Sequence, residues 1–335
     1  MKRFPSAHAM HIALALGSLR CSQADLYPIT PPASAQGGGG SSGNGSGGTA
    51  DARGGAGAGG ARGGAPNGGS PACPSAILPS GDSNQAVVVD GDMRSYVLHV
   101  PPAYSGRQAV PLVVDFHALG QSGSRERMNS PYVAELDAAG VVMAFPDGAR
   151  GPAGTAWNVG PCCVAKVDDV AFARALVDQV RGVACIDPNR VYAIGSLTGG
   201  GMAHYLACHA ADVFAAVAPA SFDLLEENVD DCKPSRQVTV ISFRGTADSR
   251  VPYDGGPSSL VPGMPITFLG AQGTHEKWAS INGCVGPPSA PDANGCSGYS
   301  GCKGGAEVIL CSTPNGADEP GDPAITWPVL QRHTL

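Results

Sequence analysis

The sequence predicts an α/β fold in which helices cover both faces of a mostly parallel central sheet. Short apolar runs of strand length alternate along the chain with segments of helical periodicity. This alternation favours a parallel sheet, because each return to a parallel strand needs a crossover that is usually a helix. A glycine-rich turn joins an apolar run at 191–194 to a helical pattern that begins near Gly200. In such sheets the functional site lies beyond the carboxyl ends of the strands, at turns of this kind.

The individual elements follow from their local patterns. The dipeptide Asp90-Gly91 predicts a tight turn between two strands. Apolar residues at helical spacing, among them Val170, Leu176 and Val180, predict a helix. The expected strands lie at 86–89, 96–100, 112–116, 141–145, 191–194, 215–218, 238–243 and 308–311. The expected helices lie at 132–139, 167–183, 200–211 and 273–281.

Composition divides the chain of 335 residues into unequal parts. Between Gly37 and Gly69, 17 of 33 residues are glycine, and branched or aromatic side chains are nearly absent. Such a stretch cannot bury enough apolar surface to offset the entropy of ordering it. We therefore expect a signal-like segment at 1–21, a flexible Gly/Ser-rich linker at 22–70 and one folded domain at 71–335.

Charge and hydropathy exclude two classes of protein. Charged residues make up 15% of the chain, the net charge is −7, and Lys and Arg form no run. A nucleic-acid binder would need a basic stripe to neutralise phosphates, so none is expected. No apolar stretch approaches the length of a membrane-spanning helix, so no membrane span is expected either.

The amino-terminal residues predict export. A short basic start, Met1 to Arg3, precedes a modest apolar run from Ala9 to Leu19, as in a secretory signal. Cys21 follows this run and precedes the long linker, which is the arrangement of a bacterial lipoprotein. Arg20 stands where a lipoprotein signal has a small residue, so lipid attachment at Cys21 stays open. The expected location is secreted, periplasmic or at the cell surface.

The cysteine count agrees with export. The chain has 11 Cys, and ten remain when Cys21 is set aside. Ten cysteines in one domain predict five disulfides formed in an oxidising compartment. No C-x2-C pair is present, so a zinc site is not expected, and nothing else in the sequence points to a cofactor. The pairing stays open, except that the four cysteines from Cys284 to Cys311 are expected to staple a local region.

The turn after the run at 191–194 reads Gly195-Ser196-Leu197-Thr198-Gly199. A strand, a tight glycine-flanked turn and a helix together form the arrangement of a nucleophile elbow. With this turn, the chain resembles the secreted α/β-hydrolases of the polyhydroxybutyrate depolymerase and feruloyl esterase type. The resemblance runs from about Ser95 to the C-terminus. Its other segments are Arg94-Ser95-Tyr96, Asp115-Phe116-His117, Phe145-Pro146-Asp147-Gly148, Trp157-Asn158, Cys162-Cys163, Asp168-Asp169-Val170, Cys185-Ile186-Asp187, Arg190-Val191-Tyr192-Ala193, Asp212-Val213-Phe214-Ala215, Gly245-Thr246-Ala247-Asp248, Val251-Pro252-Tyr253 and Trp278-Ala279.

The resemblance implies the α/β-hydrolase fold and hydrolysis of carboxylic esters by a triad in the chain order Ser, Asp, His. It places Asp248 at the acid position. It also implies an oxyanion hole made by the backbone amides of Leu119 and Thr198. His117, Trp157 and Asn158 are expected to border the cleft.

Two triad positions depart from the family pattern. Leu197 stands at the nucleophile position and has no nucleophilic atom. Ser196 lies one residue early, and its use would put Ile194 and Thr198, both β-branched, where the turn needs small residues.

The histidine position is also substituted. Alignment on Gly316 places Asp318 there, whereas alignment on the pair Trp327-Pro328 places Ile325 there. Neither side chain can serve as the base. His275 and His333 also follow Asp248 in the chain, and both are expected to be surface histidines.

These substitutions predict an exported esterase-family protein that is catalytically impaired and binds an ester, polyester or aryl-ester ligand in the old cleft. One alternative is an active serine esterase that uses Ser196 with a displaced histidine. Another is a surface module for which the disulfide-bonded domain is only a tethered scaffold.

Overall fold

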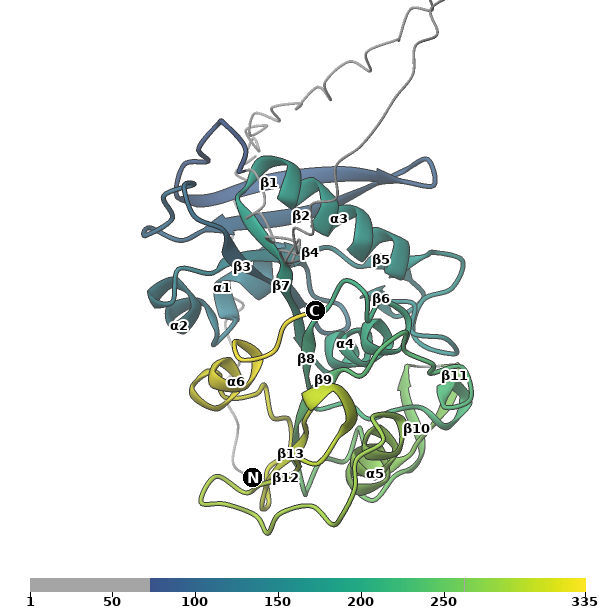
Figure 1. The fold of residues 1–335 in the computed structure, drawn as a ribbon. Coiled ribbons are helices and arrows are strands. Elements are labelled where there is room, and N and C mark those ends of the chain that lie inside the picture. The colour runs from purple at the N-terminus through teal and green to yellow at the C-terminus, as the bar shows by residue number, and fades with distance from the viewer. Residues whose placement is uncertain (1–72, 262) are drawn as a thin grey trace, which may run out of the picture. The chain divides into compact units, whose positions relative to one another are not determined.

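A computed structural model of the protein describes residues 73–261 and 263–335 (Figure 1). The predicted signal-like segment, the Gly/Ser-rich linker and Cys21 lie outside these residues. Within the described residues no helix is long and apolar enough to cross a membrane.

A nine-stranded sheet forms the centre of the domain, in the order β1-β2-β4-β3-β7-β8-β9-β13-β12. Neighbouring strands from β4 to β13 are parallel, and antiparallel pairing is confined to the two edges. The mostly parallel sheet is therefore confirmed. The strands are β1 (Gly81–Val89), β2 (Asp92–Val100), β3 (Val110–Phe116), β4 (Val142–Pro146), β7 (Ile186–Ser196), β8 (Ala216–Ala220), β9 (Thr239–Gly245), β12 (Cys296–Tyr299) and β13 (Val308–Thr313).

Helices pack on both faces of the sheet, as predicted (Figure 1). One apolar core contains Phe172, Leu206 and Trp278, which come from α3, α4 and α5. A second core on the other face contains Leu136 of α2 and Trp327 of α6. The helices are α1 (Gly123–Asn129), α2 (Val133–Ala138), α3 (Asp169–Val183), α4 (Thr198–His209), α5 (Gly270–Ile281) and α6 (Pro323–Leu330).

Several short elements were not predicted from the sequence. They are helices α1 and α6, the edge strand β12, the hairpin β5 (Ala149–Gly151) with β6 (Gly154–Ala156), and the hairpin β10 (Gly256–Val261) with β11 (Met264–Phe268). The predicted strands and helices are all present, with ends shifted by a few residues. Helix α3 begins where the side chain of Asp168 accepts a hydrogen bond from the Ala171 amide.

The ten cysteines from Cys73 onward form five disulfides, as predicted. Two of them, Cys284–Cys302 and Cys296–Cys311, lie within the region that the sequence marked as locally stapled. The others are Cys73–Cys185, Cys162–Cys163 and Cys208–Cys232.

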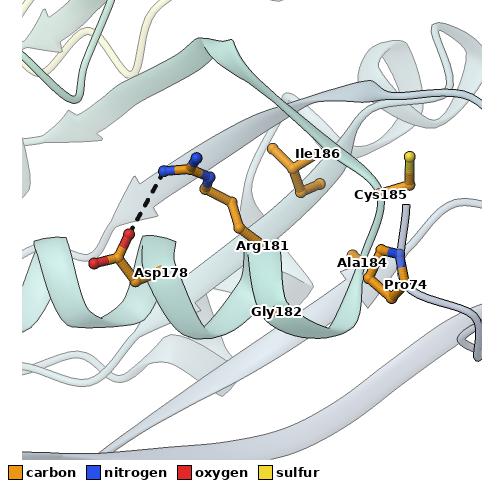
Figure 2. Close-up of a pocket in the computed structure, with 7 residues that line it drawn as sticks. All are labelled: Pro74, Asp178, Arg181, Gly182, Ala184, Cys185 and Ile186. Carbon is orange, nitrogen blue, oxygen red and sulfur yellow. Dashed lines mark ion pairs between the residues drawn. The ribbon is translucent and has the colours of Figure 1, made fainter. Parts of the chain in front are cut away.

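A hollow of about 330 Å³ adjoins the bond between Cys73 and Cys185, and Figure 2 shows the residues that line it. Its two charged side chains already pair, since Arg181 lies 3.6 Å from the carboxylate of Asp178. The hollow lies at the amino end of β7. The 11 residues of that strand, roughly 35 Å, separate it from the glycine-flanked turn.

A buried ion pair joins the edge of the sheet to α3. Arg94 on β2 donates to Asp169 at 2.7 Å, and the two side chains are 12% and 0% exposed. Arg94 also lies 4.1 Å above the ring of Phe172, and the second oxygen of Asp169 accepts from the Asn158 amide. Burial raises the pKa of Asp169, and the guanidinium of Arg94 opposes that shift. The pair therefore fixes α3 and the segment at 158 relative to β2.

We predict that Asp169→Asn lowers the free energy of unfolding by about 3 kcal/mol, because it leaves the Arg94 charge buried without a partner. The matched control is Asp212→Asn, which breaks the exposed pair Arg174–Asp212 and should cost about 0–1 kcal/mol. Urea unfolding of the two variants measures the difference. Equal losses in the two variants would contradict the structural role of the buried pair.

Candidate active site

The positions that the sequence singled out lie in loops at one edge of the sheet. Leu119 follows β3, Leu197 follows β7, Asp248 follows β9 and Asp318 follows β13. The four strands are parallel, so their carboxyl ends meet at the same edge. The Leu197 amide donates to the Ala220 carbonyl at the end of β8, which joins a fifth strand end to the group.

The turn between β7 and α4 has the backbone of a nucleophile elbow. Leu197 has φ 51° and ψ −122°, a left-handed φ that costs a branched residue of the order of 1–3 kcal/mol. Gly199 and Gly200 follow it, and a Cβ at Gly199 would lie 1.8 Å from the carbonyl oxygen of Phe116. The strained backbone is therefore present, but the side chain it presents is apolar.

Ser196 does not occupy the strained position. It is the last residue of β7, pairs with Ala220 in the sheet and is half-buried. Ser196 belongs to the strand and Leu197 to the left-handed turn, so Ser196 is not the residue that the strained backbone presents.

Two backbone amides near the elbow are available as donors. Within residues 73–261 and 263–335, neither the Leu119 amide nor the Thr198 amide donates a hydrogen bond to another residue. Thr198 is the first residue of α4, where amides have no partner inside the helix and the helix dipole favours negative charge. Both amides can therefore donate to a bound ligand.

His117 and Trp157 hold the loop that carries Leu119. His117 Nδ1 donates to the Ala118 carbonyl at 2.7 Å, and Nε2 accepts from the Gly148 amide at 2.8 Å. Burial lowers the pKa of His117, so the ring is neutral in this arrangement. Trp157 Nε1 donates to the His117 carbonyl at 2.8 Å. Both side chains are fully buried beneath this loop, whereas half-buried Asn158 lines a hollow beside α3 and α4.

Asp248 is buried and only partly hydrogen-bonded. Its Oδ1 accepts from the amides of Arg250 and Val251, at 2.9 and 3.0 Å. Its Oδ2 makes no hydrogen bond to any described residue, and a guanidinium nitrogen of Arg244 lies 3.8 Å away. A triad histidine would donate to an oxygen of this kind.

Arg244 is a buried residue beside the acid position that the sequence analysis missed. Its side chain is fully buried, donates to Asp223 and lies beside Asp248. Burial raises the pKa of Asp223 to about 6, and Arg244 opposes the shift. One guanidinium thus faces two buried carboxylates. A charged residue at the end of the apolar run at 238–243 was the only signal for it in the sequence.

Asp318 contacts the residue next to the acid loop rather than the acid itself. Its carboxylate pairs with Arg250, and the two side chains are 44% and 49% exposed. Nearby, the Ala247 amide donates to the Gly316 carbonyl at 2.8 Å, which packs this loop against the turn that holds Asp248. Ile325 instead lies in α6 and packs on the core of the opposite face. Alignment on Gly316 therefore puts a side chain near the acid, and alignment on Trp327-Pro328 does not.

No histidine in the described part of the chain hydrogen bonds to Asp248. His275 Nε2 lies 3.1 Å from the Val308 carbonyl, and His333 Nε2 lies 3.1 Å from Glu307. His275 is only 4% exposed, so the prediction that it is a surface histidine was wrong. The helical pattern of α5 did not reveal that this face packs on β13. The same described residues contain no cluster of His, Cys, Asp or Glu that could hold a metal ion.

Curated proteins related in sequence are esterases. Feruloyl esterase B of Piromyces equi is 42% identical over 245 residues, which cover 72% of this chain and 46% of that enzyme. Putative esterase NocK of Nocardia uniformis is 37% identical over 174 residues, 50% of this chain and 49% of NocK. This chain thus spans about half the length of each. Probable feruloyl esterase C of Aspergillus clavatus is 28% identical over 249 residues, 70% of this chain and 82% of the relative.

Solved structures support the fold. Acetyl xylan esterase from Aspergillus awamori superposes with a TM-score of 0.57 at 14% identity, over 74% of this chain and 99% of that enzyme. No protein-family model matches the chain. The chain therefore has the fold of an α/β-hydrolase and is similar in sequence to feruloyl esterases.

Proposed function

We propose that this domain binds a carboxylic ester at the carboxyl edge of its sheet and does not hydrolyse it. The observation that carries the proposal is Leu197, an apolar side chain on the strained backbone of a nucleophile elbow. Attack on an ester carbonyl requires an oxygen or sulfur atom at that point, and leucine supplies neither.

The base is missing as well. Among the described residues no imidazole hydrogen bonds to the buried Oδ2 of Asp248, and the Asp318 carboxylate pairs with Arg250 instead. Members of a triad act as a unit, so losing the nucleophile alone removes most of the rate. Without a triad, an oxyanion hole and substrate binding provide only a small residual catalysis.

Ester binding uses groups that this chain retains. The amides of Leu119 and Thr198 face no acceptor in the described residues, and the fold holds both in place. Their hydrogen bonds to a carbonyl oxygen do not depend on side-chain identity. Leu197 adds apolar contact next to the same carbonyl. We propose that a feruloyl or acetyl ester is the ligand. One sequence relative is a feruloyl esterase, and one structural neighbour is an acetyl xylan esterase.

We also propose that the protein functions outside the cytoplasm. Five disulfides in one domain are stable in an oxidising compartment and rare in a reducing one. The basic and apolar residues at the start of the chain support the same proposal.

We predict that the purified full chain binds ethyl ferulate without turnover. Titration calorimetry should detect binding, while p-nitrophenyl acetate and ethyl ferulate should be hydrolysed no faster by the protein than by its Ser196→Ala variant. A serine-directed fluorophosphonate should leave the protein unlabelled. Labelling that Ser196→Ala abolishes would contradict the proposal and identify an active esterase that uses Ser196.

We predict that Leu197→Ser combined with Asp318→His restores ester hydrolysis, because the first change supplies the nucleophile and the second places an imidazole near Asp248. A positioned general base typically contributes 10²–10⁴-fold, so a gain of roughly 10² over either single variant is expected. Hydrolysis of p-nitrophenyl acetate measures it. The control is Leu197→Ser with Asp318→Asn, which supplies the hydroxyl without a base. Equal rates in the two double variants would show that Asp318 is not the histidine position.

We predict that Arg250→Gln, added to the active double variant, moves the acid limb of its pH–rate profile to higher pH. The guanidinium of Arg250 disfavours a protonated imidazole at 318, so it lowers the pKa of that imidazole. Without the guanidinium, the imidazole keeps its proton up to a higher pH, so the neutral imidazole that acts as the base forms only at higher pH. A shift to lower pH would contradict this placement of Arg250.

A further inference from the structure

A second hollow, of about 390 Å³, lies beside α3 and the carboxyl-terminal end of α4. Its lining includes an aromatic pair, an amide, a carboxylate and aliphatic side chains. The residues that matter are Asn158, Asp168, Val170, Tyr205 and His209.

Tyr205 and His209 form the aromatic wall of the hollow. They are one turn apart on α4, and their ring centroids are 4.3 Å apart at an interplanar angle of 54°. Both side chains are half-buried, so each ring has one supported side and one accessible side. Burial lowers the pKa of His209 and raises the pKa of Tyr205, so both rings are neutral near pH 7. Neither ring hydrogen bonds to another described residue.

Oxygen acceptors of Asp168 and Asn158 also line the hollow. One oxygen of Asp168 accepts from the Ala171 amide at 2.8 Å, and this cap holds the carboxylate at the start of α3. Asn158 donates its side-chain amide to the Val167 carbonyl, while its backbone amide donates to Asp169. The second oxygen of Asp168 and the carbonyl oxygen of the Asn158 amide take no hydrogen bond from the described residues. Acceptors that are held in advance lose little entropy when a ligand binds.

The charges around the hollow disfavour an anion. The carboxylate of Asp168 lines the hollow, and burial together with the charges of Asp168 and Asp231 raises the pKa of Tyr205. The positive end of the α3 dipole partly offsets Asp168, and Arg174 donates a hydrogen bond to the His209 carbonyl. The hollow therefore presents two aromatic rings, an amide and a carboxylate.

We propose that this hollow binds a neutral sugar residue and is a subsite for the glycan that carries the ester. The C–H face of a sugar ring packs on an aromatic ring, and its hydroxyls donate to fixed carboxylate and amide oxygens. The identification of the glycan as the carrier rests on the proposed function, whereas sugar binding in the hollow does not.

The hollow and the ester cleft share two elements. Helix α4 begins directly after Leu197, and Tyr205 lies seven residues beyond Thr198, roughly 10 Å along the helix. Asn158 follows Trp157, whose indole holds the carbonyl of His117 in the oxyanion loop. On this proposal, one polymer chain would reach both places.

The test measures two ligands separately on the full chain by titration calorimetry. Xylohexaose and cellohexaose carry no ester and report on the hollow, and ethyl ferulate carries no sugar and reports on the cleft. At least one oligosaccharide should bind, and Tyr205→Leu should weaken it at least tenfold. Asp168→Asn should weaken it several-fold while keeping the helix cap, because asparagine caps helices as well as aspartate does. Ethyl ferulate binding should not change in either variant.

The matched control is Tyr299→Leu, because Tyr299 forms a comparable pair with His275, 4.8 Å between centroids, away from the hollow. It should leave oligosaccharide binding unchanged. Failure of both oligosaccharides to bind, or binding that ignores Tyr205→Leu and Asp168→Asn, would overturn the sugar subsite even if ethyl ferulate binds. Loss of ethyl ferulate binding alone would overturn the ester cleft and leave the subsite. Binding of tetramethylammonium, weakened by salt and without sugar binding, would reassign the hollow to a cation.

Discussion

The close approach of α4 to the ends of β3 and β8 is the constraint on which the rest of the site depends. A Cβ at Gly199 would collide with the Phe116 carbonyl, and a Cβ at Gly200 would lie 2.4 Å from the Ala220 carbonyl. Only glycine allows the helix to start so near the sheet. The chain must then turn sharply between Ser196 and Thr198, whatever residue stands between them. The left-handed backbone of Leu197 is therefore a consequence of packing, and it persists without a nucleophile to present.

Buried charge explains how the acid loop remains stable without a histidine. A buried carboxylate that loses its cationic partner normally costs several kcal/mol. Here Arg244 lies among Asp223, Asp248 and the Val251 carbonyl, so a fixed positive charge remains close to the acid. Two residues after Asp248, exposed Arg250 pairs with Asp318, so the carboxylate at the histidine position also has a cationic partner.

The fold was predictable because its signals are local. Strand-length apolar runs, helical spacing in α3 and the glycines of the elbow each act within about a dozen residues. The elements that were missed carry weak or contrary signals, since α1 is largely polar and α6 contains Pro328 in its interior. The site was less predictable, because its contacts join distant residues. Arg244 is on β9 and Asp223 is in the loop after β8, and the choice between Asp318 and Ile325 depends on how the loop after β13 packs.

Helix α4 connects the two proposed binding sites. In an esterase, binding energy from a remote part of the substrate is used to orient and distort the reacting ester. Without a nucleophile no such step follows, and the same contacts contribute to affinity alone. The elbow and the pair Tyr205–His209 are held by one helix, so in the proposed function two weak contacts to a single polymer would act at a fixed spacing and at high effective concentration. On this proposal, the substitutions at the Ser and His positions remove turnover and leave in place the elements that would hold a substituted glycan.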